Sequence, residues 1–319
     1  MTPMFDRLAL IGLGLIGSSI ARAARRHGLA RTIVAIDASA DVIARVEALG
    51  IADVTTRDLV TGVSGADCVI LCVPVGANAQ VAALIGPHLK PGAIVSDVGS
   101  VKGAVVRDVA PHLPAGVHFI PAHPVAGTEY SGPDAGFATL FENRWLVLTP
   151  PPDQDPDAIA TVQRFWEALG SNVEIMSAQH HDLVLAITSH VPHLIAYNLV
   201  GTAYDLESVV EQEVIKFSAG GFRDSTRLAA SDPTMWRDVF LNNKEAVLEM
   251  VARFSEDLAA LARMIRWGDG DGLHDLFTRT RAIRRSIIAS GQDTAAPNFG
   301  RADGIAATPG RPGDPPISQ

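Results

Sequence analysis

Seven consecutive residues near the middle of the chain carry three side chains that can bind or transfer a proton. The segment His123-Pro124-Val125-Ala126-Gly127-Thr128-Glu129 holds an imidazole, a hydroxyl and a carboxylate. An imidazole titrates near neutral pH and is the commonest general acid or base in proteins. His123 ends an apolar, strand-like run, which predicts a place at the mouth of a sheet, where the sites of α/β proteins form. The segment therefore predicts an acid–base site.

A glycine-rich segment near the N-terminus predicts a dinucleotide site. It reads Gly12-Leu13-Gly14-Leu15-Ile16-Gly17, follows an apolar strand-like run and opens a helical pattern. Gly12 permits the turn, Gly14 lets the backbone approach a pyrophosphate, and Gly17 lets the helix pack on the strand. The helix that begins near Leu15 and Ile16 would direct its first N–H groups at the phosphates. A glycine-rich turn without a ligand is the alternative.

An acidic residue at the end of the second expected strand indicates which dinucleotide binds. Asp37 lies 25 residues after Gly12, close to the spacing of a ribose-binding carboxylate. Such a carboxylate accepts hydrogen bonds from the ribose hydroxyls and repels a 2′-phosphate, and no arginine is adjacent to it in the sequence. NAD is therefore favoured over NADP. Val73 and Pro74, at the end of another apolar run, are assigned to the same cofactor site.

The first 178 residues alternate between strand-like and helical patterns. The alternation predicts an α/β, Rossmann-like, doubly wound and mostly parallel sheet. The expected strands are Leu8–Gly12, Thr32–Asp37, Cys68–Pro74, Ala93–Gly99, His118–Ala122, Trp145–Thr149 and Asn172–Ser177. The expected helices include Ser18–His27, Asp41–Leu49, Gly76–Leu89 and Asp157–Leu169.

Beyond residue 178 the pattern is helical throughout. Expected helices are Ala178–Leu206, Ser208–Lys216, Met235–Trp267 and Gly270–Ser290, with the third long enough to be a central helix. The many apolar stripes predict that this half is partly buried against a second copy of the chain. We therefore expect an NAD-binding domain over 1–178, a helical dimerisation and substrate domain over 179–291, and a disordered tail over 292–319.

Composition excludes several classes of partner. The chain has 319 residues, a formal net charge of −9 and no long basic run, so nucleic-acid binding is not expected. No basic leader and no stretch of about 18 uninterrupted apolar residues is present, so no membrane association is expected. The two cysteines, Cys68 and Cys72, are typical of buried thiols in a reducing compartment, which favours a cytoplasmic location.

Five ordered motifs give the chain a specific resemblance over roughly residues 6–290. They are the glycine-rich segment continued to Ser18-Ser19, Asp97-Val98-Gly99-Ser100-Val101-Lys102, the His123–Glu129 segment, Thr188-Ser189-His190-Val191-Pro192-His193, and Gly220-Gly221-Phe222-Arg223-Asp224-Ser225-Thr226-Arg227 with Asp232-Pro233-Thr234-Met235-Trp236-Arg237-Asp238. In this order they resemble the prephenate/arogenate, or cyclohexadienyl, dehydrogenase family of tyrosine biosynthesis.

The resemblance implies an oxidative decarboxylation. Hydride leaves ring C4 of a cyclohexadienol for NAD, the C1 carboxylate departs as carbon dioxide, and the ring becomes aromatic. His123 matches the catalytic histidine of the family, which accepts the proton of the C4 hydroxyl and so loses activity when protonated, with an inflection at roughly pH 6.5. Ser100 would lie near the nicotinamide, as part of the cofactor site, and would bond this histidine or the hydroxyl, although a bare Gly-Ser turn is the alternative. Lys102 is left unassigned, with a surface position at the start of a helix as its simplest interpretation.

Four further histidines are interpreted differently. His193 matches the substrate-pocket histidine of the family, whereas His190 is equally consistent with a packed helix histidine. Their spacing of three could suggest a metal, but no third ligand cluster is evident and the family needs no metal. His180 and His181 are expected to be solvated or capping residues.

The remaining pocket positions follow from the resemblance and from charge. Arg227 is expected to bind the ring carboxylate and Arg223 the side-chain end, since arginine suits a forked carboxylate contact. Surface pairing with nearby aspartates is the alternative for both arginines. Thr128, Glu129 and Trp236 also match pocket positions, and Trp236 could equally be core.

Two other functions compete with this one. A β-hydroxyacid dehydrogenase has the same two-domain plan but expects a lysine in its helical half as the acid–base group. A catalytically silent NAD-binding dimer is the other, and the joint presence of His123, Ser100, His193 and Arg227 argues against it.

Overall fold

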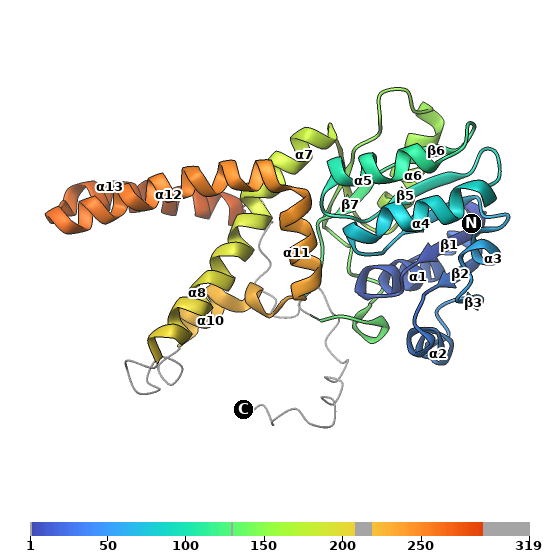
Figure 1. The fold of residues 1–319 in the computed structure, drawn as a ribbon, viewed down its shortest axis with the longest axis horizontal. Helices are drawn as coiled ribbons and strands as arrows, with labels where there is room; N and C mark the ends of the chain where they lie inside the picture. The colour runs from blue at the N-terminus through green and yellow to red at the C-terminus, as the bar shows by residue number, and fades with distance from the viewer. Residues whose placement is uncertain (1, 129, 208–218, 290–319) are drawn as a thin grey trace.

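A six-stranded parallel sheet forms the centre of the N-terminal half (Figure 1). The structure, a computed structural model, is described over residues 2–128, 130–207 and 219–289. The strand order is β3-β2-β1-β4-β5-β6, which reverses direction between β1 and β4. The strands are β1 Phe5–Ile11, β2 Ala30–Ile36, β3 Val54–Thr56, β4 Cys68–Leu71, β5 Ile94–Asp97 and β6 His118–Ile120. A reversal of this kind is where an open α/β sheet forms its ligand crevice.

Apolar strands explain why the sheet is buried on both faces. Leu8 and Leu10 of β1 belong to one hydrophobic cluster and Ala9 and Ile11 to the other, because side chains alternate along a strand. Helices cover both faces (Figure 1). They are α1 Leu15–His27, α2 Ala40–Leu49, α3 Leu59–Val63, α4 Asn78–Ile85, α5 Lys102–Val109 and α6 Pro156–Ala168. The predicted doubly wound α/β architecture is confirmed.

The run expected as one strand over His118–Ala122 is two strands in different sheets. β6 ends at Ile120, and β7 begins at Ala122 after Pro121. β7 Ala122–Pro124 pairs antiparallel with β8 Trp145–Leu148, which pairs parallel with β9 Asn172–Ile175. Because Pro121 has no N–H to donate, it suits the point at which the chain leaves the first ladder. His123 therefore lies within the second sheet and does not end a strand of the first.

The C-terminal half is helical, but the expected central helix is wrong. The run Met235–Trp267 is divided between α11 Pro233–Asn242 and α12 Lys244–Trp267, with Asn243 at the break. The other described elements are α7 Ala178–Leu185, a π-helical turn Ala186–His190, α8 Val191–Glu207, α10 Gly220–Thr226 and α13 Gly270–Ala289. Figure 1 shows α12 and α13 side by side and projecting from the body, and the buried residues of α12 are Val247 and Met250.

Two of the expectations for this half lie outside the described residues: the helix Ser208–Lys216 and the tail 292–319. One described stretch, Ala178–Asp205, is long and apolar enough to cross a membrane by length and composition, with a mean hydropathy of 1.4. The same stretch carries the buried polar side chains His181, Asp182 and His190, two of which bond to the N-terminal half. We therefore assign it to the junction of the two halves.

The two halves meet at the carboxyl ends of β4 and β5. Val75 after β4, together with Val101 and Ala104 at the start of α5, packs with Trp236 and Val239 of α11. The approach is close, since a Cβ on Gly76 would lie 2.9 Å from a carboxylate oxygen of Asp238. This junction brings residues from distant parts of the chain to the edge of the sheet where ligands bind.

Candidate active site

The three glycines of the N-terminal motif have different surroundings. Gly12 has a φ of +95°, and a Cβ on it would lie 2.6 Å from the carbonyl oxygen of Cys72. A Cβ on Gly17 would collide with the carbonyl oxygen of Gly12, so both positions need glycine for packing. A Cβ on Gly14, by contrast, would meet no atom of the protein within 4 Å. Gly14 stands at the N-cap of α1, just before Leu15 and Ile16, where a pyrophosphate fits against the free N–H groups.

Asp37, the expected ribose-binding residue, supports the glycine loop. Its two carboxylate oxygens accept hydrogen bonds from the backbone N–H groups of Leu13 and Ser39, each at 2.9 Å. The fold also brings a cation that the sequence did not place there, because Nε of Arg57 donates to the carbonyl oxygen of Ala38 at 3.0 Å. An arginine therefore lies near Asp37 in the folded protein, although none is adjacent to it in the sequence.

The other two residues assigned to the cofactor lie beside this loop. Val73 is half-buried, and its Cγ1 would lie 3.3 Å from a Cβ on Gly12. Pro74 is exposed just before the short 3₁₀ turn Val75–Ala77. Both therefore lie at the carboxyl end of β4, next to the strand-order reversal.

His123 is buried and held at one ring nitrogen. Its Nδ1 lies 2.8 Å from Nε2 of His181, and among the described residues no group bonds to its Nε2. Burial lowers the pKa of His123 well below 6.5, and the nearby His181, Lys102 and His190 lower it further. The imidazole is therefore neutral at physiological pH, as a proton acceptor must be.

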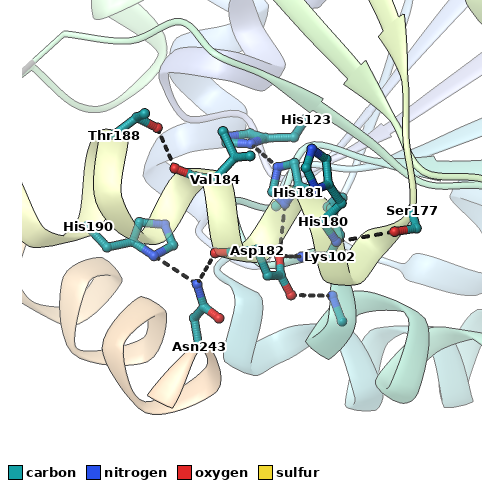
Figure 2. Close-up of polar contacts among 12 residues, drawn as sticks. Lys102, His123, Ser177, His180, His181, Asp182, Val184, Thr188, His190 and Asn243 are labelled. Atoms are coloured by element: carbon teal, nitrogen blue, oxygen red, sulfur yellow. Dashed lines mark hydrogen bonds and ion pairs between the residues drawn. The ribbon is translucent and has the colours of Figure 1, made fainter. Parts of the chain in front are cut away.

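His181 is not the solvated residue that the sequence suggested. It is fully buried, and its Nδ1 lies 2.8 Å from Oδ1 of Asp182. Figure 2 draws this contact as a dashed line. His180 does lie at the surface, and its backbone N–H donates to the hydroxyl of Ser177, which caps α7. The neighbouring histidines thus differ because the helix turns one inward and the other outward.

Lys102 is not at the surface either. It is fully buried and its ammonium pairs with Asp97 while donating to the carbonyl oxygen of Ala122 at 2.6 Å. Asp97 also accepts the backbone N–H of Gly99 at 2.7 Å and that of Ala122 at 3.1 Å. The ion pair therefore connects the end of β5 to the start of β7, directly beside His123.

Ser100 lies within the loop that this ion pair closes, between Gly99 and the start of α5. Its side chain is half-buried, and its hydroxyl forms no hydrogen bond with the described residues, His123 included. Its expected bond to His123 is therefore not formed in this structure, and its expected role toward a bound ligand stays a prediction.

His190 is buried in the π-helical turn of the helical half. Nδ2 of Asn243 lies 3.1 Å from its Nδ1, while its Nε2 has no hydrogen-bond partner among the described residues. Burial lowers the pKa of His190 to about 4. Asn243, the residue that breaks the expected long helix, therefore belongs to the site (Figure 2).

His193 and Trp236 form a stacked pair. Their ring centroids are 3.5 Å apart with an interplanar angle of 22°, and Nδ1 of His193 donates to the carbonyl oxygen of Ser189 at 2.9 Å. Burial, opposed by that carbonyl and reinforced by the charge of Arg227, lowers the pKa of His193. Trp236 is buried in the junction core, yet its Nε1 has no partner among the described residues. Trp236 is therefore part of the core, and its expected place in the substrate pocket stays a prediction.

Both arginines are exposed, but their neighbours differ. Arg227 follows α10 directly and its charge acts on His193, as expected of a residue near the pocket. Arg223 is exposed and pairs with Asp224 at 3.2 Å, which is the surface network named as its alternative.

The hydroxyl of Thr128 accepts the backbone N–H of Tyr130 at 3.3 Å, and Glu129 lies outside the described residues. No group of three or more potential metal ligands occurs in the described ranges.

Two family models match consecutive parts of this chain. One, described as the nucleotide-binding domain of prephenate dehydrogenase, covers residues 20–175. The other, described as the dimerization domain of prephenate dehydrogenase, covers residues 177–279. The chain belongs to the prephenate dehydrogenase family. Membership confirms the resemblance drawn from the five motifs, including those carried by His123 and Arg227.

Similar proteins span nearly the whole chain. A cyclohexadienyl dehydrogenase of Zymomonas mobilis is 43% identical over 284 residues, which are 89% of this chain and 97% of that protein. A prephenate dehydrogenase of Bacillus subtilis is 32% identical over 90% of this chain and 77% of its own length. The prephenate dehydrogenase of Aquifex aeolicus, solved with hydroxyphenyl propionate and NAD+, has a TM-score of 0.83 and 34% identity over 88% of this chain and 98% of that one. As a member of the prephenate dehydrogenase family, this protein is an NAD-binding oxidoreductase.

Proposed function

We propose that this protein converts prephenate to 4-hydroxyphenylpyruvate, arogenate to tyrosine, or both, by NAD-dependent oxidative decarboxylation. The observation that carries the proposal is His123, a buried neutral imidazole at the junction of the two halves, with Nδ1 bonded and with no partner for Nε2 in the part of the chain that the structure describes. The ligands in the Aquifex aeolicus structure, hydroxyphenyl propionate and NAD+, support it, since a hydroxyphenyl acid resembles the product.

The residues of the site divide the chemical work. Gly14 and Asp37 would hold NAD, which would supply the acceptor for the hydride of ring C4. His123 accepts the proton of the C4 hydroxyl at Nε2, which favours the developing carbonyl. Ser100, on the loop that Asp97 and Lys102 hold, is proposed to bond the same hydroxyl. Arranging these groups around C4 contributes to the rate because the reactants need not find that geometry by diffusion.

The helical half is proposed to bind the anionic groups of the substrate. Arg227 supplies the charge for the ring carboxylate, and His193 with Trp236 forms the wall of the pocket beside it. Thr128, Glu129 and His190 complete the proposed pocket, with Arg223 at its outer edge. Loss of the carboxylate is then driven by aromatisation of the ring.

The alternative β-hydroxyacid dehydrogenase lacks its acid–base group. Among the described residues after 178, Lys244 is the one lysine, and it is exposed at the start of α12. The groups that converge at the junction are imidazoles instead.

We also propose the division 1–178, 179–291 and 292–319, with a homodimer formed through the helical domain. The end of β9 at Ile175 and the start of α7 at Ala178 support the first boundary. Large apolar side chains exposed on the helices support the dimer, and they include Leu248, Phe254, Leu258, Ile265, Trp267, Phe277 and Ile283. Light scattering at micromolar concentration should show a particle of twice 33.7 kDa. A single-chain mass throughout would contradict the dimer.

A direct assay tests the activity. Purified protein is offered NAD with prephenate and, separately, with arogenate, and the absorbance of the reduced cofactor is followed. Turnover of at least one substrate, with release of carbon dioxide, is expected. If neither substrate reduces NAD, the proposed function is wrong, and the ratio of the two kcat/KM values otherwise decides between them.

A further inference from the structure

The hydrogen bonds that lead away from His123 fix the position of every proton among them. The last residue in this series of hydrogen bonds is Asp182. Its Oδ1 accepts the backbone N–H of Lys102 at 2.7 Å, and its Oδ2 accepts that of Gly103 at 2.8 Å. A proton on either carboxylate oxygen would face one of these N–H groups. Asp182 is therefore an acceptor only, placed at the N-terminus of α5 where a negative charge is favoured.

His181 must donate to that acceptor. Its Nδ1 lies 2.8 Å from Oδ1 of Asp182, so Nδ1 carries the proton. Burial lowers the pKa of His181, although Asp182 opposes the effect, and a neutral imidazole has only one N–H. The Nε2 of His181 therefore has a lone pair and accepts a hydrogen bond.

The same step applied once more determines the state of His123. Its Nδ1 lies 2.8 Å from Nε2 of His181, a contact drawn in Figure 2. Because Nε2 of His181 has the lone pair, Nδ1 of His123 carries the proton and Nε2 of His123 has a lone pair. We propose that His181 and Asp182 are positioning residues that hold His123 in the Nδ1–H tautomer, so that its Nε2 always faces the substrate hydroxyl as an acceptor. This proposal rests on the proposed function for its catalytic meaning, but the tautomer itself is a property of the free protein.

The tautomer matters because the other one is inactive as a base. With the proton on Nε2, His123 would present a donor to the C4 hydroxyl and could not accept its proton. The same contacts also help once the proton has moved. The new imidazolium keeps its Nδ1–H bond to His181, and the carboxylate of Asp182 lies at the far end of the pair to offset the positive charge, much as a buried aspartate orients and stabilises a catalytic histidine in hydrolases.

Charged groups around His123 set the limits of this effect. His181 and Asp182 face it from α7, Lys102 from α5 with Asp97 beside it, and His190 from the π-helical turn. Lys102 disfavours a second positive charge, so a neutral His123 in a defined tautomer is the resting state. The ion pair with Asp97 does not bond to either imidazole, which leaves tautomer control to His181.

The first experiment measures the tautomer without turnover. Protein labelled with 15N-histidine is studied at pH 8 by long-range 1H–15N correlation spectra, and the signals of His123 and His181 are assigned with the variants His123→Asn and His181→Phe. Both rings should show the Nδ1–H pattern. A neutral imidazole without a partner favours the Nε2–H form, so an Nε2–H pattern for His123 in the unmodified protein overturns the proposal.

Variants then connect the tautomer to catalysis. His181→Phe keeps an aromatic ring but removes the acceptor, so the His123 signals should move toward the Nε2–H pattern. The kcat should fall about 10-fold or more, yet by less than the 10²–10⁴ expected for loss of the base. In His181→Gln the side-chain carbonyl can accept from Nδ1, and part of the tautomer signal and of kcat should return. KM for NAD should change in neither variant, and His180→Phe, at the exposed neighbour, should change nothing.

The outcomes separate the two proposals. Loss of kcat in His181→Phe with an unchanged His123 tautomer, or loss that His181→Gln does not relieve, contradicts tautomer control and leaves a packing role. If His181→Phe does not fold, the tautomer of the unmodified protein and the Gln variant still decide. A correct tautomer in a protein that oxidises neither substrate would instead contradict the proposed function alone.

Discussion

His123 and His190 are both buried, both neutral and both bonded through Nδ1 to a group from the helical half, yet they present opposite chemistry at Nε2 (Figure 2). His123 donates to the lone pair of His181 and keeps its own lone pair at Nε2. His190 accepts from the amide of Asn243, because the same Nδ2 atom also donates to the carbonyl oxygen of Asp182 at 2.9 Å and cannot be an oxygen. Its proton is therefore on Nε2.

The difference shows that burial and orientation control separate properties. Burial removes the charge from both rings, whereas the atom that meets Nδ1 decides whether Nε2 accepts or donates. His123 is thereby a base and His190 a donor. The donor belongs to the side of the site where His193, Trp236 and Arg227 are proposed to meet the anionic substrate, and the base to the side where the hydroxyl loses its proton.

Replacing His123 should have the largest effect. His123→Asn keeps a polar side chain but has no base, so kcat should fall by a factor of order 10²–10⁴ while NAD still binds. Because its pKa is lowered well below 6.5, the unmodified enzyme should keep its rate down to a lower pH than the inflection near 6.5 expected from an ordinary histidine. The rate should fall only as the pH approaches the lowered pKa.

Rate measurements from pH 4.5 to 9, with a folding control by circular dichroism, check this prediction. The acid limb should be missing from whatever rate His123→Asn retains. Near-normal turnover, or the same acid limb in the variant, would transfer the role of base to His190 or His193.

Arg227 tests the donor side of the comparison. Arg227 is exposed in the structure, and a substrate carboxylate bound to it would bury the contact. Loss of such a charge-assisted contact costs roughly 2–5 kcal/mol, so Arg227→Ala should raise KM for the substrate about 30-fold or more. NAD affinity and the acid limb should be unaffected. Arg223→Ala, at the outer edge of the proposed pocket, is the comparison and should raise KM less, since an exposed ion pair such as that of Arg223 with Asp224 contributes about 1 kcal/mol at most. Equal effects of the two replacements would contradict the assignment of the ring carboxylate to Arg227.

Asn243 tests the donor histidine itself. Asn243→Leu removes the amide that fixes His190, so KM for the substrate should rise several-fold and the 15N pattern of His190 should lose its pure Nε2–H form. The tautomer of His123 should not change, because Nε2 of His181 still accepts the hydrogen bond from Nδ1 of His123. A shift of both histidines together would show that they are coupled, contrary to the comparison. Loss of the bond to the Asp182 carbonyl should also lower the unfolding temperature, with a net contribution of about 1 kcal/mol.

The sequence predicted the parts of the site that local spacing defines. The glycine motif with Asp37, and His123 within its own motif, are readable because strand, turn and helix follow one another along the chain. The pair His181 and Asp182 was missed because its contacts to His123 and Lys102 span 58 and 80 residues. In the sequence, two adjacent histidines next to an aspartate are typical of a solvated helix start. Only the fold shows that one of them is buried.

Lys102 and Asn243 were missed for other physical reasons. A lysine is almost never fully buried unless it is paired, and its partner Asp97 was visible five residues earlier, so that pairing was the available signal. The run Met235–Trp267 contains no glycine or proline that would mark the end of a helix. The pair Asn242-Asn243 is the one local signal at the position where the helix breaks. Side-chain amides compete with helical hydrogen bonds, so this pair indicated the break.

The smallest effect is expected far from both histidines, at the adenosine end of the cofactor site. Asp37→Ser removes the carboxylate that opposes a 2′-phosphate, and Arg57, bonded to the carbonyl oxygen of Ala38, then offers it a cation. The preference for NAD over NADP should narrow several-fold. In the double variant Asp37→Ser/Arg57→Ala the preference for NAD over NADP should increase again, because the 2′-phosphate loses the Arg57 guanidinium as a partner. Both measurements use kcat/KM for the two cofactors at saturating substrate.

Asp37 also bonds the backbone N–H of Leu13, so its loss loosens the glycine loop for either cofactor. The ratio of the two kcat/KM values cancels this common cost, whereas each value alone does not. The acid limb and the His123 tautomer should be the same in all of these variants, because no hydrogen bond among the described residues connects Asp37 to His181. A better use of NADP than NAD by the unmodified protein would contradict the role given to Asp37, and a changed acid limb would show that the cofactor end does influence the base.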